Sequence, residues 1–289
     1  MTGSALHEQA PAKVNLCLYV GPTREDGRHE LVSVFQPVGL TDEVDLEPAG
    51  LGTATDRVLC PGIEGENLAA VALRRFRERT GWDGRPVVLR IEKRIPIAAG
   101  MAGGSADAGA ALRLVARAAG LENDALLREI GAELGADVAA QVRPRRYLAT
   151  GVGERLTPLP PPAPYGVLVL PSNAELATAD VYREFDRQGL PRDAADLAAR
   201  LREVSTAAAD LPDELIVNDL EPAARALCPA IDEALATARQ VGAHHAFVCG
   251  SGPTVIGLFG DLRGARGAAA RLSERKPRPV AVAPWGAML

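Results

Sequence analysis

The chain is poor in aromatic residues, histidine and cysteine. Aromatic side chains make up 4% of the 289 residues, and there are four histidines and four cysteines. Such a low aromatic content argues against the stacking platforms on which proteins bind single-stranded nucleic acid. The formal net charge of −5 gives no basic footprint for nucleic acid either. We therefore expect no nucleic-acid partner and a core built from aliphatic side chains.

The cysteines show no metal-binding or disulfide pattern. They are Cys17, Cys60, Cys228 and Cys249. No two have CxxC spacing and no nearby histidine completes a zinc motif, which is typical of reduced thiols in a cytoplasmic protein. Residues 1–12 do not resemble a signal peptide, and glycines and Pro253 interrupt the longest uncharged stretch, residues 240–260. We expect a cytoplasmic monomer or homodimer without membrane segments or a cluster of metal-ligating side chains.

Hydrophobic patterning predicts a mixture of strands and helices. Residues 11–20 alternate, so Leu16 is expected on an apolar face of a strand, and Lys13 and Asn15 on a more polar face. Further strands are expected at 29–38, 42–47, 87–92, 166–170 and 279–282, with two more around 250–253. Helices are expected at 67–80, 105–119, 124–135, 178–187, 194–204, 221–240 and 261–274.

A proline-rich segment divides this pattern into two parts. Residues 157–164 read TPLPPPAP, which is typical of an extended linker. We place a domain boundary there, with an N-terminal domain at 1–157 and a C-terminal domain at 164–289. Strands and helices mix in both parts without regular βα alternation, which predicts two α+β domains.

The segment richest in chemical information lies between an expected strand and an expected helix. It consists of Pro96, Ile97, Ala98, Ala99, Gly100, Met101, Ala102, Gly103, Gly104, Ser105 and Ala106. Its glycines allow close approach to an anion, and the free amides at the start of the next helix favour phosphate oxygens. Ser105 can cap that helix or contact phosphate or metal. A tight structural turn would also use these glycines, so both interpretations remain open.

Three other segments carry weaker signals. Lys13 and Asn15 share one face of the first strand, although a lysine there can also be a surface residue. Asp137 follows a helix-ending glycine in LGADV, a position where aspartate often caps the next helix. Residues 249–254 read CGSGPT, which is also common in a plain turn between strands.

Together and in this order, the four segments resemble the GHMP kinases, a superfamily of small-molecule kinases. The phosphate loop of that superfamily has the form PxxxGLGSSAA, in which residues 101–105 here occupy the GLGSS position. Residues 24–31 (REDGRHEL), 93–107, 151–154, 218–222 and 251–254 are similar to one branch. Members of that branch use ATP to phosphorylate the 2-hydroxyl of a cytidine diphosphate-linked methylerythritol in non-mevalonate isoprenoid (terpenoid) biosynthesis.

Three positions depart from the branch pattern. Arg28 stands where a tyrosine is usual before His29, and that tyrosine is expected to contact cytosine. An arginine can also stack its guanidinium on a base. Residues 139–141 read AAQ instead of the usual PFF, and Ala106 replaces a second serine of the loop.

The resemblance implies a ribosomal-S5-like N-terminal domain and a ferredoxin-like C-terminal domain, with the active site in the cleft between them. It implies ATP along residues 96–106 with Mg²⁺ between the phosphates, and Asn67 near the adenine. Asp137 is expected to act as the base, and Lys13 to lie near Asp137 and the transferred phosphoryl group. The positions that map to substrate binding are Asn15, Arg28, His29, Asp137, Thr178 and Tyr182.

Two alternatives remain open at this stage. One is a different GHMP-type small-molecule kinase whose cytidine site is redirected by Arg28. The other is a GHMP-fold protein that binds a ligand without catalysis. The presence of both Lys13 and Asp137 argues against the second alternative, because a sensor has no chemical need for that pair.

Overall fold

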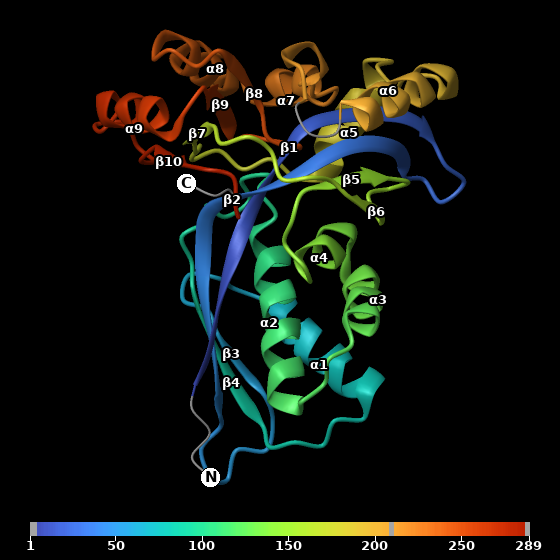
Figure 1. Ribbon diagram of the computed structural model, residues 1–289, viewed down its shortest axis with the longest axis vertical. Coiled ribbons are helices and arrows are strands. Elements are labelled where there is room, and N and C mark those ends of the chain that lie inside the picture. Colours follow the sequence, from blue (N-terminus) through green and yellow to red (C-terminus); the bar gives the residue numbers. More distant parts are fainter. Residues whose placement is uncertain (1–4, 208–210, 287–289) are drawn as a thin grey trace. The chain divides into compact units, whose positions relative to one another are not determined.

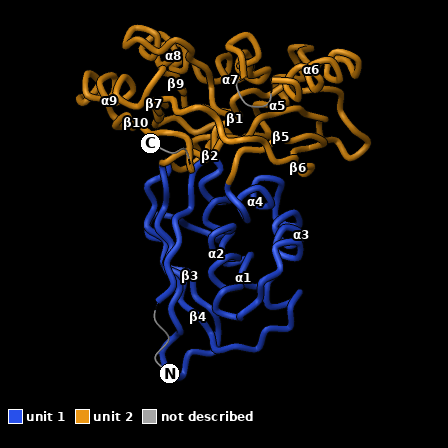
Figure 2. Tube along the Cα trace, in the orientation of Figure 1, with its two compact units in different colours: residues 1–12, 40–95, 102–144 blue, residues 13–39, 96–101, 145–289 orange. Residues whose placement is uncertain are grey.

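The computed structural model describes residues 5–207 and 211–286, which belong to two compact units (Figure 1, Figure 2). The first unit comprises residues 1–12, 40–95 and 102–144, and the second comprises residues 13–39, 96–101 and 145–289. Strands β1 (Leu6–Thr23) and β2 (His29–Pro48) contribute residues to both units. The chain therefore passes between the units several times, and the single domain boundary at 157–164 stays a prediction.

In its described residues, the first unit combines the end of a sheet with four helices. Its further elements are β3 (Arg57–Leu59), α1 (Leu68–Thr80), β4 (Val87–Glu92), α2 (Gly103–Ala119), α3 (Asp124–Leu134) and α4 (Ala136–Gln141). The second half of β2 pairs antiparallel with β4, from Glu43 opposite Glu92 to Pro48 opposite Val87. Strand β4 also pairs with β3, in parallel. Helix α2 packs against α1, α3 and α4.

Small side chains allow these helices to approach closely. Helix α2 buries a long run of alanines together with Leu112 and Leu114. A Cβ atom at Gly109 would lie 2.6 Å from the carbonyl oxygen of Gln141 on α4, and one at Gly131 would lie 3.0 Å from the Cα atom of Ala139. The alanines at 139 and 140, which replace the proline and the first phenylalanine of the branch pattern, are buried in this contact. The lack of aromatic bulk is thus matched by tight backbone packing around α4.

The second unit contains an antiparallel sheet covered by helices. Its elements are β5 (Tyr147–Thr150), β6 (Arg155–Pro158), β7 (Gly166–Leu170), α5 (Thr178–Arg187), α6 (Ala194–Thr206), the short 3₁₀ helix η1 (Asp213–Leu215), α7 (Glu221–Leu227), α8 (Ala230–Gln240), β8 (His245–Val248), β9 (Val255–Phe259), α9 (Leu262–Arg271) and β10 (Val280–Val282). Four strands follow the order β10-β7-β9-β8, all antiparallel. Strand β2 also pairs with β5, and β5 with β6.

The structure corrects several expectations about single elements. The helix expected at 221–240 is wrong as one element, because it breaks at Cys228 and Pro229, where proline cannot continue the α7 ladder. The strands expected at 29–38 and 42–47 are one strand, β2, which runs through Pro37 and Gly39. The helix expected at 124–135 is α3, which ends at Leu134 and is capped by Asn123. The α+β class itself is confirmed.

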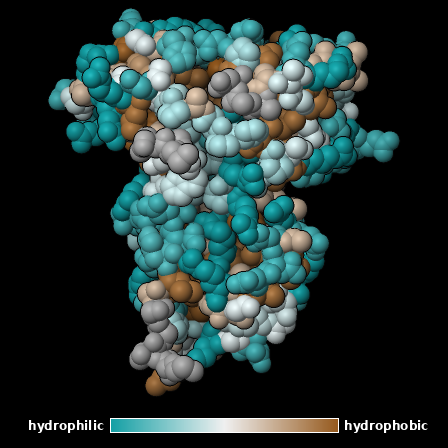
Figure 3. All heavy atoms as spheres, viewed as in Figure 1, coloured by the Kyte–Doolittle hydropathy of each residue, from teal (hydrophilic) through white to brown (hydrophobic). Residues whose placement is uncertain are grey.

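The face of the molecule shown in Figure 3 carries mostly hydrophilic side chains, and the hydrophobic ones appear in small groups. Among the described residues, no helix is both long enough and apolar enough to cross a membrane.

The contact between α2 and α4 yields a prediction. Gly109→Ala should lower the free energy of unfolding by about 1–3 kcal/mol, because the new methyl group must displace the backbone of Gln141. Gly267→Ala is the matched control on the exposed face of α9, where the nearest atom belongs to the flexible Arg271 side chain. The control should gain up to about 1 kcal/mol from helix propensity. Urea unfolding of both variants measures the difference, and a neutral Gly109→Ala would show that α4 is not packed in this way.

Candidate active site

A buried polar chain on β1 lies at the centre of the candidate site in the second unit. The Lys13 Nζ atom donates to Asn15 Oδ1 at 2.8 Å, and Asn15 Nδ2 donates to the hydroxyl of Ser33 on β2, also at 2.8 Å. Lys13 is only 7% exposed and its ammonium lies 4.5 Å from the centre of the Phe35 ring. The alternative that Lys13 is a surface lysine is therefore wrong. The expected polar face of the strand exists, but it is buried.

Three segments of the second unit meet backbone to backbone at this strand, and we call this contact the glycine junction (Lys13, Gly100, Met101, Cys249 and Gly252). The amide of Lys13 donates to the carbonyl oxygen of Met101 at 3.1 Å. A Cβ atom at Gly100, whose φ is 72°, would lie 2.3 Å from the carbonyl oxygen of Cys249 and 3.1 Å from that of Gly252. The Lys13 strand, the start of the glycine-rich loop and the CGSGPT turn are thus held together.

The turn at 249–254 is fixed from its other side by a buried asparagine. Asn218, which is 6% exposed, donates from Nδ2 to the carbonyl oxygens of Val248 at 2.8 Å and Gly250 at 2.7 Å. Its Oδ1 accepts from the amide of Leu220 at 3.0 Å. This turn is therefore more than a plain connection between β8 and β9. The segment around Asn218 carried a resemblance, but only long-range contacts reveal this role of its side chain.

Four of the residues expected to bind substrate fall into three groups in the second unit. His29 stacks on Tyr182 with 5.4 Å between the ring centres, and its Nε2 lies 3.1 Å from Asp186 Oδ1. Helix α5 begins at Thr178 as expected, and the Thr178 hydroxyl lies 3.0 Å from that of Ser251 in the turn. Arg28 lies apart from these contacts: its side chain is 64% exposed and forms an ion pair with Asp26 at 2.7 Å.

The glycine-rich loop has unusual backbone angles. Ala98, Gly100 and Ala102 all have positive φ values, 53°, 72° and 57°. Residues with side chains rarely adopt this region, and such strain is concentrated at ligand sites. Ala102 is the N-cap residue of α2 and makes no side-chain cap. Ser105 lies inside the helix, so the alternative in which it caps α2 is wrong.

In the first unit, a lysine lies between two carboxylates beside the start of α2. Lys93 Nζ donates to Asp42 Oδ2 at 2.5 Å and to Asp107 Oδ2 at 2.7 Å. Lys93 and Asp107 flank the loop in sequence, but Asp42 comes from β2, and nothing in the local pattern indicated it. None of the three was among the expected site residues.

Two further expected residues lie in the first unit. Asn67 is the N-cap residue of α1, and its Oδ1 accepts from the amide of Ala69 at 2.8 Å. Asp137 is the second residue of α4 and is partly exposed. The cap position of α4 belongs to Gly135, without a side-chain cap. The alternative that Asp137 only caps the next helix is therefore wrong.

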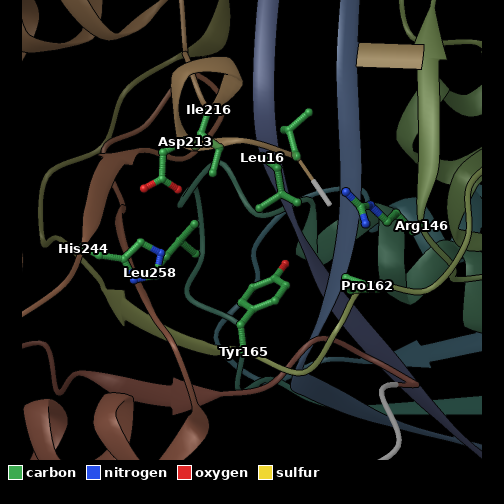
Figure 4. Close-up of a pocket in the computed structure, with 9 residues that line it drawn as sticks. Leu16, Arg146, Pro162, Tyr165, Asp213, Ile216, His244 and Leu258 are labelled. Carbon is green, nitrogen blue, oxygen red and sulfur yellow. The ribbon is translucent and has the colours of Figure 1, made fainter. Parts of the chain in front are cut away.

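A cavity of about 140 Å³ in the second unit lies away from the expected residues (Figure 4). Leu16, Tyr165 and Ile216 are among the side chains that line it. Leu16 alternates with Asn15 along β1, so the cavity lies on the opposite face of the strand from the polar chain. The Tyr165 hydroxyl is buried without a hydrogen-bond partner among the described residues, and burial raises its pKa well above the ordinary value.

Comparisons with known proteins agree with this geometry. The model of the GHMP kinases N terminal domain matches residues 67–144, and that of the GHMP kinases C terminal matches residues 194–278. A homoserine kinase from Cytophaga hutchinsonii shares the fold, with a TM-score of 0.74 at 17% identity over 98% of this chain and 95% of that one. The shared fold and the two matching family models together identify the chain as a GHMP kinase.

Closer relatives narrow the assignment. A 4-diphosphocytidyl-2-C-methyl-D-erythritol kinase from Anaeromyxobacter dehalogenans is 41% identical over 92% of this chain and 84% of its own length. The enzyme of that name from Streptomyces coelicolor is 42% identical over 89% and 88%. A crystal structure of 4-(cytidine 5'-diphospho)-2C-methyl-D-erythritol kinase superposes with a TM-score of 0.79 at 34% identity, over 97% of this chain and 100% of that one. The chain belongs to this kinase family.

The role of Asn218 yields a prediction. Asn218→Asp should lower the free energy of unfolding by about 3 kcal/mol, because it replaces a donor to two buried carbonyl groups with a carboxylate oxygen. Asn123→Asp makes the same change at the exposed cap of α3, where aspartate caps as well as asparagine. Thermal and urea unfolding of both variants give the comparison. Equal stability of the two variants would contradict the described turn.

Proposed function

We propose that this protein transfers the γ-phosphoryl group of ATP to the 2-hydroxyl of 4-diphosphocytidyl-2-C-methyl-D-erythritol. The observation that carries the proposal is the glycine junction, because it gathers three of the four kinase-like segments at one place in the second unit. The similarity to kinases of that name over most of the chain supports the choice of substrate. The buried polar chain around Lys13 supports catalysis over ligand binding alone.

The chemistry asks mainly for positioning and charge stabilisation. Phosphoryl transfer through a loose transition state does not require early deprotonation of the attacking hydroxyl. We assign Asp137 to orient the 2-hydroxyl and accept its proton late. We assign Lys13 to offset the charge that develops on the transferred group. Asn15 holds the Lys13 ammonium by the hydrogen bond described above, so it also positions this charge.

The nucleotide is proposed to lie along residues 96–106, with its phosphates at the amides that begin α2. The positive φ values at Ala98, Gly100 and Ala102 support this, because anion-binding backbone concavities use such angles. Asn67 is proposed near the adenine. The described residues contain no cluster of three metal-ligating side chains, so Mg²⁺ would be held chiefly by phosphates and water, with the Ser105 hydroxyl as a protein ligand. When bound, Mg²⁺ neutralises charge on the phosphates.

The substrate is proposed to contact the residues of the second unit that surround α5. The stacked pair of His29 and Tyr182 offers an aromatic surface for the base, and Thr178 adds a hydroxyl beside the turn. Arg28, held by Asp26, is proposed to stack on cytosine where relatives use tyrosine.

Cysteines in the described residues are free thiols, and burial raises the pKa of Cys17 to about 12. Free thiols are usual in a cytoplasmic enzyme, and the raised pKa makes the Cys17 thiol unreactive.

The substrate assignment is tested by ADP release with a panel of alcohols. The enzyme with ATP and Mg²⁺ is offered 4-diphosphocytidyl-2-C-methyl-D-erythritol, homoserine, mevalonate and galactose separately. Turnover only with the cytidylyl substrate supports the proposal. Turnover with another alcohol would favour a redirected GHMP kinase, and ATP binding without turnover of any alcohol would favour a non-catalytic protein.

Gly104 provides a clean test of the phosphate site. A Cβ atom there meets nothing within 4 Å, so Gly104→Val should fold normally while its side chain occupies the space of phosphate oxygens. We expect ATP affinity to fall by at least about tenfold, measured by calorimetry. Gly50→Val, also in open space in the first unit, is the matched control and should bind ATP like the wild type. If Gly104→Val bound ATP with wild-type affinity, the phosphates would not lie at residue 104 and the proposed nucleotide site would be wrong.

Lys13 and Asp137 are tested as a functional pair. Asp137→Asn should lower kcat by about 10²–10⁴ with little change in substrate affinity, because the lost interaction strengthens in the transition state. Lys13→Ala should lower kcat by a similar factor. The double variant should lower kcat by much less than the product of the two single factors. Steady-state kinetics with melting temperatures as a folding control measure this. A folded Asp137→Asn enzyme with near-wild-type kcat would exclude the assigned role.

A further inference from the structure

Lys93 stands beside the phosphate loop, yet its charge is already engaged. Its side chain is 13% exposed, and those of its two partners Asp42 and Asp107 are 0% and 2% exposed. Burial opposes the charged form of Lys93, but the two carboxylates outweigh it and raise the pKa of the lysine. An ammonium bound by two buried carboxylates is poorly suited to neutralise phosphate. The lysine must therefore serve another purpose.

The two carboxylates connect Lys93 to opposite ends of the loop. Asp42 Oδ1 accepts from the amides of Arg94 at 2.5 Å and Ile95 at 2.8 Å, which fixes the chain as it leaves β4. Asp107 lies one turn after Gly103, the first residue of α2. A Cβ atom on Gly103 would lie 3.3 Å from Lys93 Nζ, so the first residue of the helix lies directly beside the ammonium group.

Asp107 has no direct route to a ligand. Its Oδ1 atom is buried from water and has no hydrogen-bond partner among the described residues. A nucleotide reaching the protein from solvent cannot touch an oxygen that water does not reach. Whatever Asp107 contributes to the site must pass through Lys93.

We propose that Asp42, Lys93 and Asp107 form a positioning clamp that fixes the start of α2, and with it the amides of Gly103 and Gly104, for the phosphates of the nucleotide. This proposal rests on the proposed kinase function. The three are positioning residues. In some glycine-rich loops a mobile lysine contacts the phosphate directly. Here the lysine is held in a fixed ion pair beside the helix, and it acts by positioning the helix start.

The clamp is tested first without nucleotide, by hydrogen exchange of the backbone amides of residues 106–110, the first hydrogen-bonded amides of α2. Asp107→Ala should exchange these amides at least about tenfold faster than the wild type. Asp56→Asn is the matched control: it weakens a partly buried ion pair with Arg77 in the same unit, on α1. It should leave exchange at 106–110 unchanged. ATP titration of the same variants should show about tenfold weaker binding for Asp107→Ala alone.

The two proposals can fail separately. Unchanged exchange in Asp107→Ala overturns the clamp, as does faster exchange with unchanged ATP affinity or an equal effect of Asp56→Asn. Wild-type protein that binds no ATP overturns the kinase function, while the exchange result still decides whether the clamp exists.

Asp107→Asn supplies a second measurement should Asp107→Ala fail to fold. Its side-chain oxygen can still accept a hydrogen bond from Lys93, but the bond loses the assistance of the carboxylate charge. Exchange at residues 106–110 should rise roughly threefold to tenfold, and the ATP dissociation constant should rise by a similar factor. Wild-type exchange and wild-type ATP affinity in Asp107→Asn would overturn the clamp.

Discussion

The absence of a side chain at Gly100 is the constraint on which the candidate site depends. Only glycine lets the loop backbone pass so close to the carbonyl oxygen of Cys249, and the same contact keeps Met101 within hydrogen-bond distance of Lys13. A methyl group at residue 100 would push the loop away from β1 and the turn. The glycine junction thus determines where the glycine-rich loop starts relative to the lysine that we assign to catalysis. Asn218 supports it by fixing the turn from behind.

The same use of small residues organises the first unit. Gly109 and Gly131 let α2 and α3 approach α4 almost backbone to backbone, and α4 carries Asp137. The alanines after Asp137 fit this arrangement, because both are buried where the helices approach most closely. A chain with 4% aromatic residues builds rigid supports through close contact, since well-packed small side chains leave few voids. Precise placement here comes from backbone proximity.

Much of this could be predicted from local sequence. Helix α5 begins and ends where expected, and so does β7, because helical periodicity and apolar runs are local signals. The family followed from the order of four segments, each ambiguous alone. The break at Pro229 was missed even though proline signals it, because the apolar period continues across it. The clamp could not be predicted, since Asp42 lies 51 residues before Lys93 and meets it only through sheet pairing. The burial of Lys13 on β1 also depends on partners far along the chain.

The most direct test of the central claim is the position of the phosphate in the product. The enzyme is incubated with ATP, Mg²⁺ and 4-diphosphocytidyl-2-C-methyl-D-erythritol, and the product is examined by proton-coupled phosphorus NMR. Carbon 2 of the substrate bears a methyl group and no hydrogen. Transfer to the 2-hydroxyl therefore predicts a new monoester signal without three-bond proton coupling. A doublet or triplet, from a phosphate on carbon 3 or carbon 1, would contradict the proposed function.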